Sequence, residues 1–266
     1  MVRYGLVIDL DRCIGCQTCA IACKLENNVS LGNWWNRVLT VGGSMIDTSS
    51  GSYPNTSIFY LPITCQHCDN APCVKACPVS GTYRREEDGT VQLRIERCVG
   101  CRYCMAACPY GVRVFNWAEP KHLPEHGTGY QGVVKDEGWI IYSPERPKGV
   151  VEKCTLCIHR ITDGQEPFCV AMCPARARFF GDLDDPNSKV SKLVKERSGV
   201  RLLEELGTQP KTYYLPPKRG KQSFTNLYEA FVKHVESTLT SIISTSSDIS
   251  LKAIASATLK RVLQRG

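Results

Sequence analysis

All sixteen cysteines of the 266-residue chain fall into four groups of four, and thiolate sulfur is the ligand that zinc and iron–sulfur clusters prefer. Groups I and III share the spacing C-x2-C-x2-C-x3-C, whereas group II reads C-x2-C-x4-C-x3-C and group IV reads C-x2-C-x11-C-x3-C. A proline follows the last cysteine of groups II, III and IV. In chain order the groups are Cys13, Cys16, Cys19 and Cys23; Cys65, Cys68, Cys73 and Cys77; Cys98, Cys101, Cys104 and Cys108; and Cys154, Cys157, Cys169 and Cys173.

The spacing of groups I and III is that of the cluster-binding run of bacterial ferredoxins. Two residues between cysteines allow a tight loop whose thiolates surround three corners of one 4Fe–4S cubane, and backbone N–H groups of the loop can point at the cluster sulfides. The cysteine three residues further on lies in a helix and points toward a neighbouring cluster. The following proline fixes the exit of the chain and adds no competing donor. The pattern therefore predicts one-electron transfer through iron–sulfur clusters.

Three other uses of cysteine fit the pattern less well. Zinc sites also use C-x2-C pairs, but zinc needs four ligands as two pairs, which leaves the repeated third cysteine and the fourth at x3 unexplained. Disulfide frameworks belong to secreted chains that are usually much shorter, and the N-terminal residues show no signal peptide. A redox-active dithiol requires a lone C-x2-C pair, and none of the four groups is one.

The charge balance agrees with buried anionic clusters. The formal net charge of +7 would by itself suggest nucleic acid or an anionic surface as a partner, but it counts every cysteine as neutral. With sixteen thiolates and four cubane cores of about +2 each, the net charge becomes about −1. We therefore expect the basic residues to balance clusters and expect no nucleic acid partner. Five of them lie in or beside the groups: Lys24, Lys75, Arg97, Arg102 and Lys153.

Distances along the chain indicate which groups pair. Groups II and III are separated by 20 residues that are typical of a β-hairpin with its turn at Asp88 and Gly89, so they form one two-cluster unit. Groups I and IV are separated by 130 residues, and each lacks a local partner. We expect these two to form a second unit into which the first is inserted.

In two-cluster ferredoxins the last cysteine of each run binds the cluster of the other run, and this rule predicts four crossed sets of iron ligands. His67 and His159 lie among the groups, but sixteen cysteines already fill every ligand position. The sets are numbered as follows: set 1 is Cys13, Cys16, Cys19 and Cys173; set 2 is Cys154, Cys157, Cys169 and Cys23; set 3 is Cys65, Cys68, Cys73 and Cys108; set 4 is Cys98, Cys101, Cys104 and Cys77.

Short structural elements must position these thiolates. Three groups have an Ala- or Val-containing stretch before the last cysteine that suits one or two helical turns. Because regular structure is sparse, clusters act as the core, and we expect the metal-free chain not to fold. Residues 27–57 and 114–148 form two arms with two tryptophans each, which either dock a partner or cover the clusters. Strands are expected before the groups at Tyr4–Ile8, Ile58–Leu61, Val91–Ile95 and Gly149–Val151.

The predicted fold class is α+β, with two nested bacterial two-cluster ferredoxin-like modules, little regular secondary structure and a C-terminal helical tail. Residues 210–221 are rich in Pro and Lys and are expected to be a connector. The tail should contain one helix carrying Phe224, Leu227, Tyr228, Phe231, Val235 and Leu239, and a second that begins near the capping residue Asp248. It either binds a partner or membrane surface or packs on the protein itself. The outer module comprises residues 1–57 and 131–215, the inner module 58–130, and the helical extension 216–266.

Beyond the cysteines, the sequence resembles the four-cluster iron–sulfur subunit of the complex iron–sulfur molybdoenzymes. That family includes dimethyl sulfoxide, polysulfide, thiosulfate, tetrathionate and arsenate reductases. The resemblance covers about residues 3–215, and the tail after about residue 220 has no counterpart in the common core of the family. The segments that carry it are Val7–Cys13, Ala22–Asn28, Cys68–Cys73, Cys108–Gly111, Arg146–Cys154 and Gly181–Pro186.

The resemblance implies a non-catalytic electron-transfer subunit. Its partners would be a catalytic subunit with a molybdenum or tungsten bis-pterin cofactor, and a quinone-reactive membrane subunit or a soluble carrier. Some relatives replace the second cysteine of group III and hold a three-iron cluster there, so Cys101 implies four 4Fe–4S clusters.

Two alternatives remain open: a free-standing polyferredoxin, and a subunit of a soluble molybdenum or tungsten enzyme without a membrane anchor. No apolar run approaches the roughly 20 residues needed to span a bilayer. We therefore expect membrane association through partners, on either the cytoplasmic or the extracytoplasmic face.

Overall fold

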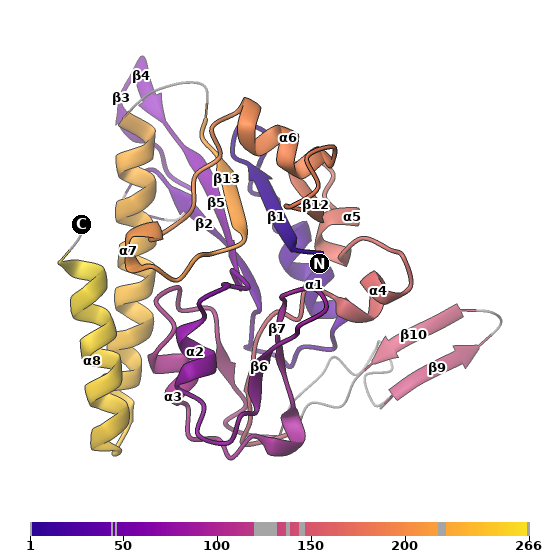
Figure 1. Cartoon of the computed structure of the whole chain (residues 1–266). Helices are drawn as coiled ribbons and strands as arrows, with labels where there is room; N and C mark the ends of the chain where they lie inside the picture. Colours follow the sequence, from indigo (N-terminus) through magenta and orange to yellow (C-terminus); the bar gives the residue numbers. More distant parts are fainter. Residues whose placement is uncertain are drawn as a thin grey trace.

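The computed structural model describes residues 2–119 except 44 and 46, and then residues 132–136, 139–143, 147–217 and 222–264. Within these residues, six small sheets and several short helices surround the cysteines, and two long helices lie along one side (Figure 1). This mixture of short helices and small sheets agrees with the predicted α+β class. The predicted module boundary at residues 130 and 131 and the side chains of Phe224, Leu227, Tyr228 and Trp139 lie outside the described part.

A three-stranded sheet joins segments that are far apart in the sequence. Strand β1 (Tyr4–Asp9) lies in its centre, antiparallel to β12 (Arg178–Asp182) and parallel to β13 (Thr212–Leu215). Helix α6 (Lys189–Glu196) packs on this sheet. The sheet thus holds the N-terminal segment against the segment that follows group IV. Its buried apolar residues are Val7, Phe179, Val190 and Leu215.

Strand β13 corrects one prediction from the sequence, because it lies within the expected connector at residues 210–221. The segment Thr-Tyr-Tyr-Leu favours a strand, since aromatic and β-branched side chains fit a pleated, half-buried surface. Tyr214 is fully buried, and its hydroxyl donates a hydrogen bond to the carbonyl oxygen of Pro62 at 3.0 Å. The nearby prolines concealed this strand from the sequence prediction.

The remaining described sheets are two-stranded and antiparallel. Between groups II and III, β6 (Thr82–Arg84) and β7 (Val91–Leu93) form the predicted hairpin. In the turn of this hairpin, Asp88 Oδ1 accepts hydrogen bonds from the N–H and the hydroxyl of Thr90. The pairs are β2 (Asn36–Val41) with β5 (Phe59–Thr64), β3 (Ser50–Ser52) with β4 (Asn55–Ser57), β6 (Thr82–Arg84) with β7 (Val91–Leu93), β8 (Val114–Phe115) with β11 (Val151–Glu152), and β9 (Gly132–Asp136) with β10 (Trp139–Ser143).

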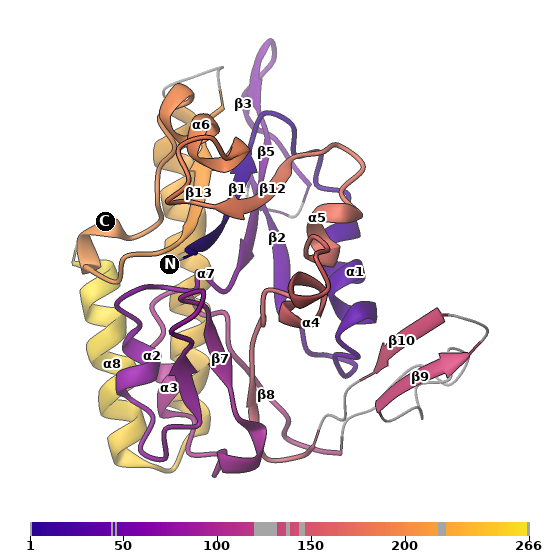
Figure 2. The same ribbon diagram turned by 45° about the vertical axis from the view of Figure 1, so that its right-hand side comes forward.

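Short helices follow the cysteine loops. Figure 2 shows α1 (Thr18–Glu26) and α5 (Phe168–Ala171) side by side, so a helix of group I contacts a helix of group IV. The helices of groups II and III, α2 and α3, also contact each other. The helices are α1 (Thr18–Glu26), α2 (Pro72–Lys75), α3 (Tyr103–Ala106), α4 (Ile158–Thr162) and α5 (Phe168–Ala171), and two 3-10 turns span Ile95–Arg97 and Glu204–Leu206.

The C-terminal end of the chain forms a helical hairpin of α7 (Gln222–Thr245) and α8 (Ile249–Leu263). Asp248 caps α8, because its Oδ1 accepts hydrogen bonds from the backbone N–H groups of Ser250 at 2.8 Å and Leu251 at 3.2 Å. The hairpin packs on the protein itself, since α8 contacts α3 and α7 contacts β2. Its fully buried apolar residues are Phe231, Val235, Leu239, Leu251, Ala255 and Val262.

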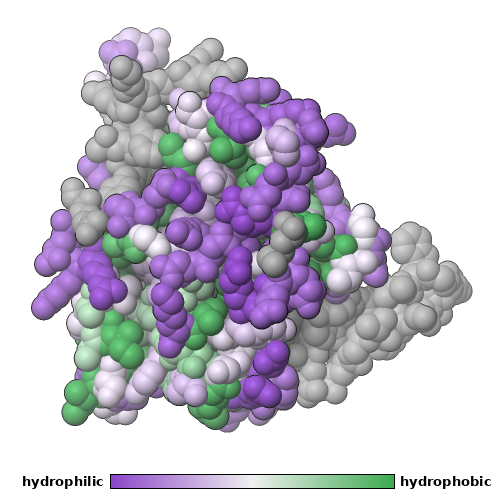
Figure 3. All heavy atoms as spheres, in the orientation of Figure 1, coloured by the Kyte–Doolittle hydropathy of each residue, from purple (hydrophilic) through white to green (hydrophobic). Residues whose placement is uncertain are grey.

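The surface in Figure 3 is mostly hydrophilic, and apolar colour gathers at the lower left over α8. Among the described residues, no helix combines the length and the hydropathy that a membrane span requires.

Candidate cluster-binding sites

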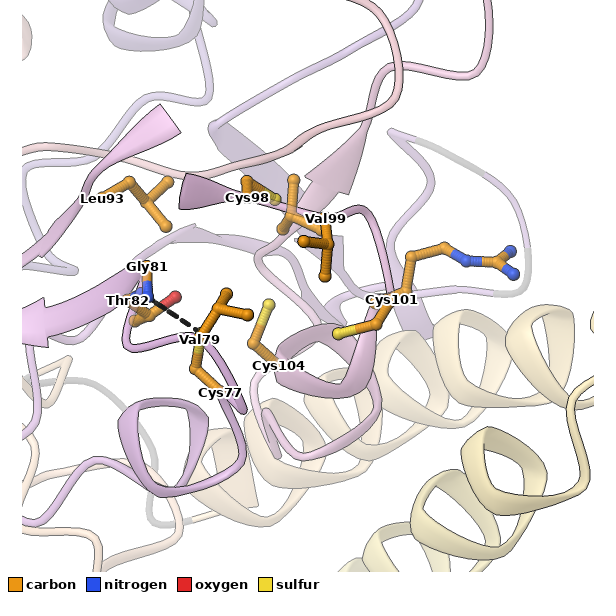
Figure 4. A pocket seen from close by; sticks show the side chains of 11 residues that line it. Cys77, Val79, Gly81, Thr82, Leu93, Cys98, Val99, Cys101 and Cys104 are labelled. Carbon is orange, nitrogen blue, oxygen red and sulfur yellow. Dashed lines mark hydrogen bonds between the residues drawn. The ribbon is translucent and has the colours of Figure 1, made fainter. Parts of the chain in front are cut away.

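The hollow in Figure 4 brings together the four cysteines predicted as set 4. Cys98, Cys101 and Cys104 come from the loop of group III and from α3, whereas Cys77 comes from the end of group II. The hollow spans about 350 Å³ when its opening to solvent is included, and its other walls are mainly apolar, with Val79, Val99, Leu93 and Val151 among them.

Two further hollows, each about 330 Å³ with the opening to solvent included, contain another predicted set each. One is lined by all four cysteines of set 3, together with His67, Tyr110 and Arg113. The other is lined by all four cysteines of set 1, together with Arg178. Each hollow therefore joins three cysteines of one group to the last cysteine of another: Cys108 from group III enters set 3, and Cys173 from group IV enters set 1.

Sets 1 and 2 both include cysteines of group IV, and set 2 is the more deeply buried of the two. Burial, and then the neighbouring thiols of Cys154, Cys169 and Cys157, raise the pKa of Cys23 well above its ordinary value. The side-chain amide of Asn27 donates to Cys23 Sγ and to Cys157 Sγ, both at 3.8 Å. The last cysteine of group I thus lies with the first three of group IV.

All sixteen cysteines are free thiols in this structure. In the described part of the chain, no group of three His, Cys, Asp or Glu side chains is arranged to hold a single metal ion. The sulfurs of sets 1, 3 and 4 line hollows, as ligands to a polynuclear cluster would.

The loops of groups I and III have the same backbone conformation, which shows that the repeat in sequence is a repeat in structure. Gly15 and Gly100, each just before the second cysteine of its group, have φ values of 70° and 69°. Gln17 and Arg102, each just after that cysteine, have φ values of 60° and 61°. A left-handed conformation favours glycine, so Gly15 and Gly100 allow the chain to turn tightly between the first two cysteines.

The last cysteines of groups II and IV also receive equivalent hydrogen bonds. The N–H of Gly81 donates to Cys77 Sγ at 3.2 Å, and the N–H of Ala177 donates to Cys173 Sγ at 3.3 Å. Each donor follows its cysteine by four residues. Although burial opposes it, the pKa of Cys77 is lowered, because backbone N–H groups including that of Gly81 stabilise its thiolate. Donors aimed at sulfur are what an anionic cluster requires.

The charges of the buried thiolates show whether these sites fit an iron–sulfur cluster. Burial and then the Cys73 thiol raise the pKa of Cys108 to about 12, and burial raises the pKa of Cys169 to about 11. Four thiolates in one buried hollow therefore need a positive centre between them, which a cubane core of about +2 provides. The four-thiol sets, the hollows and the N–H donors fit 4Fe–4S clusters.

In the order 1, 2, 3, 4, each set lies close enough to the next for a thiol of one to act on a thiol of the other, and we call this order the row of sets. The Cys19 thiol of set 1 acts on the pKa of Cys169 in set 2, and the Cys154 thiol of set 2 acts on that of Cys65 in set 3. The Cys73 thiol of set 3 acts on the pKa of Cys104 in set 4. All eight cysteines of sets 2 and 3 are buried, whereas sets 1 and 4 each have three cysteines that are at least partly accessible. The row therefore has a buried middle and two accessible ends.

Two site residues were not predicted from the sequence. Arg113 lines the hollow of set 3 and Arg178 that of set 1, and both are almost completely buried. Each follows the last cysteine of its group, Cys108 or Cys173, by five residues. This repeated spacing is a signal that the sequence already contained, but burial of an arginine is rare enough that it was not expected.

The tryptophans and histidines have different roles. Trp35 of the first arm is buried, whereas Trp117 of the second arm is 61% exposed and its ring lies 4.6 Å from the guanidinium of Arg102. The arms thus contain both a buried and an exposed tryptophan. His67 Nδ1 accepts a hydrogen bond from the N–H of Val91 at 3.2 Å, and His159 pairs with Glu26 at 2.8 Å.

The chain matches two family models that agree with this chemistry. Residues 56–123 and 130–183 match a 4Fe–4S dicluster domain, and residues 6–25 match a 4Fe–4S binding domain. Together these segments contain all sixteen cysteines.

Several reductase subunits are similar over most of the chain. A Halobacterium salinarum protein assigned as the iron–sulfur subunit of a dimethyl sulfoxide reductase is 56% identical over 221 residues, which cover 81% of this chain and 79% of the relative. The arsenate respiratory reductase iron–sulfur subunit of a Shewanella species is 40% identical, covering 80% and 96%. A polysulfide reductase subunit of Wolinella succinogenes is 35% identical, covering 82% and 96%.

Proposed function

Because the chain belongs to the family of iron–sulfur subunits of dimethyl sulfoxide, arsenate, tetrathionate and polysulfide reductases, we propose that it is an electron-transfer subunit that holds four 4Fe–4S clusters. The row of four cysteine sets, buried in the middle and accessible at both ends, is the observation that carries this proposal. Each cluster, when bound, takes up and releases one electron. Substrate chemistry belongs to a partner subunit, and this chain is not an enzyme by itself.

The ligands in this proposal are the four crossed sets. The grouping of thiols supports them, because each of the three hollows is lined by one complete set and by no cysteine of another. The proposal includes the nested modules: residues 1–57 with 131–215, and residues 58–130 between them. The β1–β12 pairing supports the outer module, since it joins the strand before group I to the strand after group IV.

The residues around the thiols have two tasks. Apolar walls, such as the buried Val91 and Val112 around set 3, keep water from the sulfurs. Backbone N–H groups, such as those of Gly81 and Ala177, donate to thiolate sulfur and stabilise negative charge there. Burial and hydrogen bonds to sulfur are two of the factors that determine the reduction potential of such a site.

The accessible ends suggest where electrons enter and leave. Sets 1 and 4 approach the surface beside exposed apolar residues, Ile14 at set 1 and Val99 at set 4. We propose that one end faces a molybdenum or tungsten bis-pterin catalytic subunit and the other a quinone-reactive membrane subunit or a soluble carrier. Association with a membrane, on either face, then occurs through partners.

Metal analysis of the natively purified complex under anaerobic conditions tests the proposal. We expect about 16 Fe from this chain, with any cluster of a partner adding to it, and one Mo or W per copy. Iron near that level without Mo or W indicates the alternative of a free-standing polyferredoxin. Iron with Mo or W in a complex that needs no detergent for extraction indicates a soluble enzyme without an anchor. Zinc in place of iron contradicts the proposal altogether.

A further inference from the structure

Three basic side chains are buried among the cysteine sets: Arg113 and Arg178 are 3% exposed, and Lys153 is fully buried. A buried cation is unfavourable unless negative charge lies near it. The described hydrogen-bond acceptors of these three residues are carbonyl and amide oxygens, a hydroxyl and a thiol, and none of them is a carboxylate. The thiolates of the neighbouring cysteine sets can supply negative charge at these places.

Arg178 lies between sets 1 and 2. It lines the hollow of set 1, and its guanidinium donates to Cys169 Sγ of set 2 at 3.7 Å. A second bond of 2.9 Å to Asn36 Oδ1 holds the guanidinium in place.

Arg113 occupies the corresponding place between sets 3 and 4. It lines the hollow of set 3, and its guanidinium donates to the hydroxyl of Thr82 at 3.2 Å. Thr82 in turn lines the hollow of set 4, and its N–H donates to Cys77 Sγ at 3.4 Å. A second guanidinium nitrogen of Arg113 is buried and has no hydrogen-bond partner among the described residues.

Lys153 lies at the junction of the two modules, between sets 2 and 3. Its Nζ donates to the carbonyl oxygen of Cys154, a member of set 2, at 2.8 Å, and to that of Val91. Val91 lines the hollow of set 3.

We propose that these three interleaved cations, Arg178, Lys153 and Arg113, fill the three gaps in the row of sets and raise the reduction potential of the two clusters that flank each gap. This inference rests on the proposed function, because it requires four clusters. Each added electron makes a cluster more negative, and a nearby cation attracts that charge more strongly in a medium of low dielectric than it would in water. When an electron moves from one cluster to the next, the cation between the two clusters stabilises the added negative charge on either cluster.

The internal repeat argues against a chance arrangement. Arg113 and Arg178 each follow the last cysteine of their group by five residues, and each lies between the two sets of its own module. The two modules share little sequence outside the cysteines, yet each has a guanidinium group between its two sets.

Charge-removing variants of the natively purified complex test the inference. Arg178→Met, Lys153→Met and Arg113→Met are each titrated reductively, with electron paramagnetic resonance as the readout and iron content measured in parallel. Each variant should lower two of the four midpoint potentials most strongly. The Lys153 variant should share one lowered potential with each arginine variant, whereas the two arginine variants should share none.

Matched controls separate charge from packing. Arg113→Lys, Arg178→Lys and Lys153→Arg keep the charge and should leave the potentials near those of the unaltered protein, and Lys192→Met removes an exposed charge and should shift none. Four unchanged midpoints in the methionine variants, or equal shifts in the charge-retaining variants, would overturn the inference. Loss of iron in all three methionine variants would also overturn it, because the cations would then serve assembly and not potential. Fewer than four midpoints in the unaltered protein would contradict the proposed function instead.

Discussion

Residues 2–217 and the α7–α8 hairpin are organised in different ways. In the first region the longest described helix has nine residues, and three of the cysteine sets line hollows among the buried apolar side chains. In the hairpin, helices of 24 and 15 residues bury apolar side chains against each other. We therefore expect bound metal to contribute much of the stability of the first region, whereas side-chain packing alone stabilises the second.

Removal of iron should have the largest effect on this contrast. Without metal, buried thiols crowd together at hollows that nothing fills, so we expect residues 2–217 to unfold while the helices lose less structure. Amide hydrogen exchange measured before and after anaerobic chelation checks this, with β1 and β12 expected to lose their protection first. Unchanged exchange in both strands, with an unchanged far-ultraviolet circular dichroism spectrum, would contradict the account.

Substitution of Phe231 tests the packing of the hairpin. Phe231 is fully buried, and its ring centroid lies 6.2 Å from that of Tyr110, which lines the hollow of set 3. Phe231→Ala should lower the free energy of unfolding by about 3–5 kcal/mol in chemical denaturation of the iron-loaded protein. The matched control is Ile249→Ala in α8, which removes a side chain that is 84% exposed and should change stability by less than about 0.5 kcal/mol.

The pH dependence of stability should also report on the hairpin. Burial and then the positive charge of Arg37 lower the pKa of His234 in α7 to about 4, below its ordinary value of 6.5. The unfolded chain therefore binds a proton between pH 6.5 and pH 4 that the folded chain does not bind. This contribution to stability is full above pH 6.5 and should fall by about 2 kcal/mol at pH 5.

His234→Gln removes the titrating group from α7, so the slope of stability against pH between 6.5 and 4 should become smaller. Denaturant melts at pH 7, 6 and 5 measure the slope in both proteins. An identical slope in the two proteins would show that the hairpin does not bury this histidine.

A smaller effect is expected at the start of α8. Asp248→Ala removes the acceptor for the N–H groups of Ser250 and Leu251 and should cost about 1 kcal/mol, whereas Asp248→Asn should cost less because asparagine also caps helices. Thermal melts of the iron-loaded protein measure both. Equal losses in the two variants would show that the negative charge, and not the cap, stabilises this end.

Much of the site could be predicted because its determinants are local. The spacing of the cysteines, with Gly15 and Gly100 at the tight turns, follows from the short distance between ligands of one cluster. The hairpin between groups II and III was predicted from the Asp88–Gly89 turn, and the structure confirms it. Features that depend on neighbours a few residues away were therefore visible in the sequence.

Features that depend on distant neighbours were not. Strand β13 lies in a segment predicted to be a connector, because its pairing with β1 joins residues about two hundred positions apart. Arginine usually lies on the protein surface, so the residue type of Arg113 and Arg178 was no reason to expect them to be buried. Only the thiols that surround them explain their burial. The hairpin was predicted as two helices, but the sequence could not show whether they pack on this chain or on a partner.

The most direct test of the account counts intact 4Fe–4S clusters per chain in two double variants, by Mössbauer spectroscopy of the purified complex. In the crossed arrangement, Cys23 and Cys157 bind one cluster and Cys16 binds another. Cys23→Ala combined with Cys157→Ala should then leave three intact clusters, as each single variant does, whereas Cys23→Ala combined with Cys16→Ala should leave two. The reverse result, two for the first pair and three for the second, would contradict the crossed sets and the nested modules built on them.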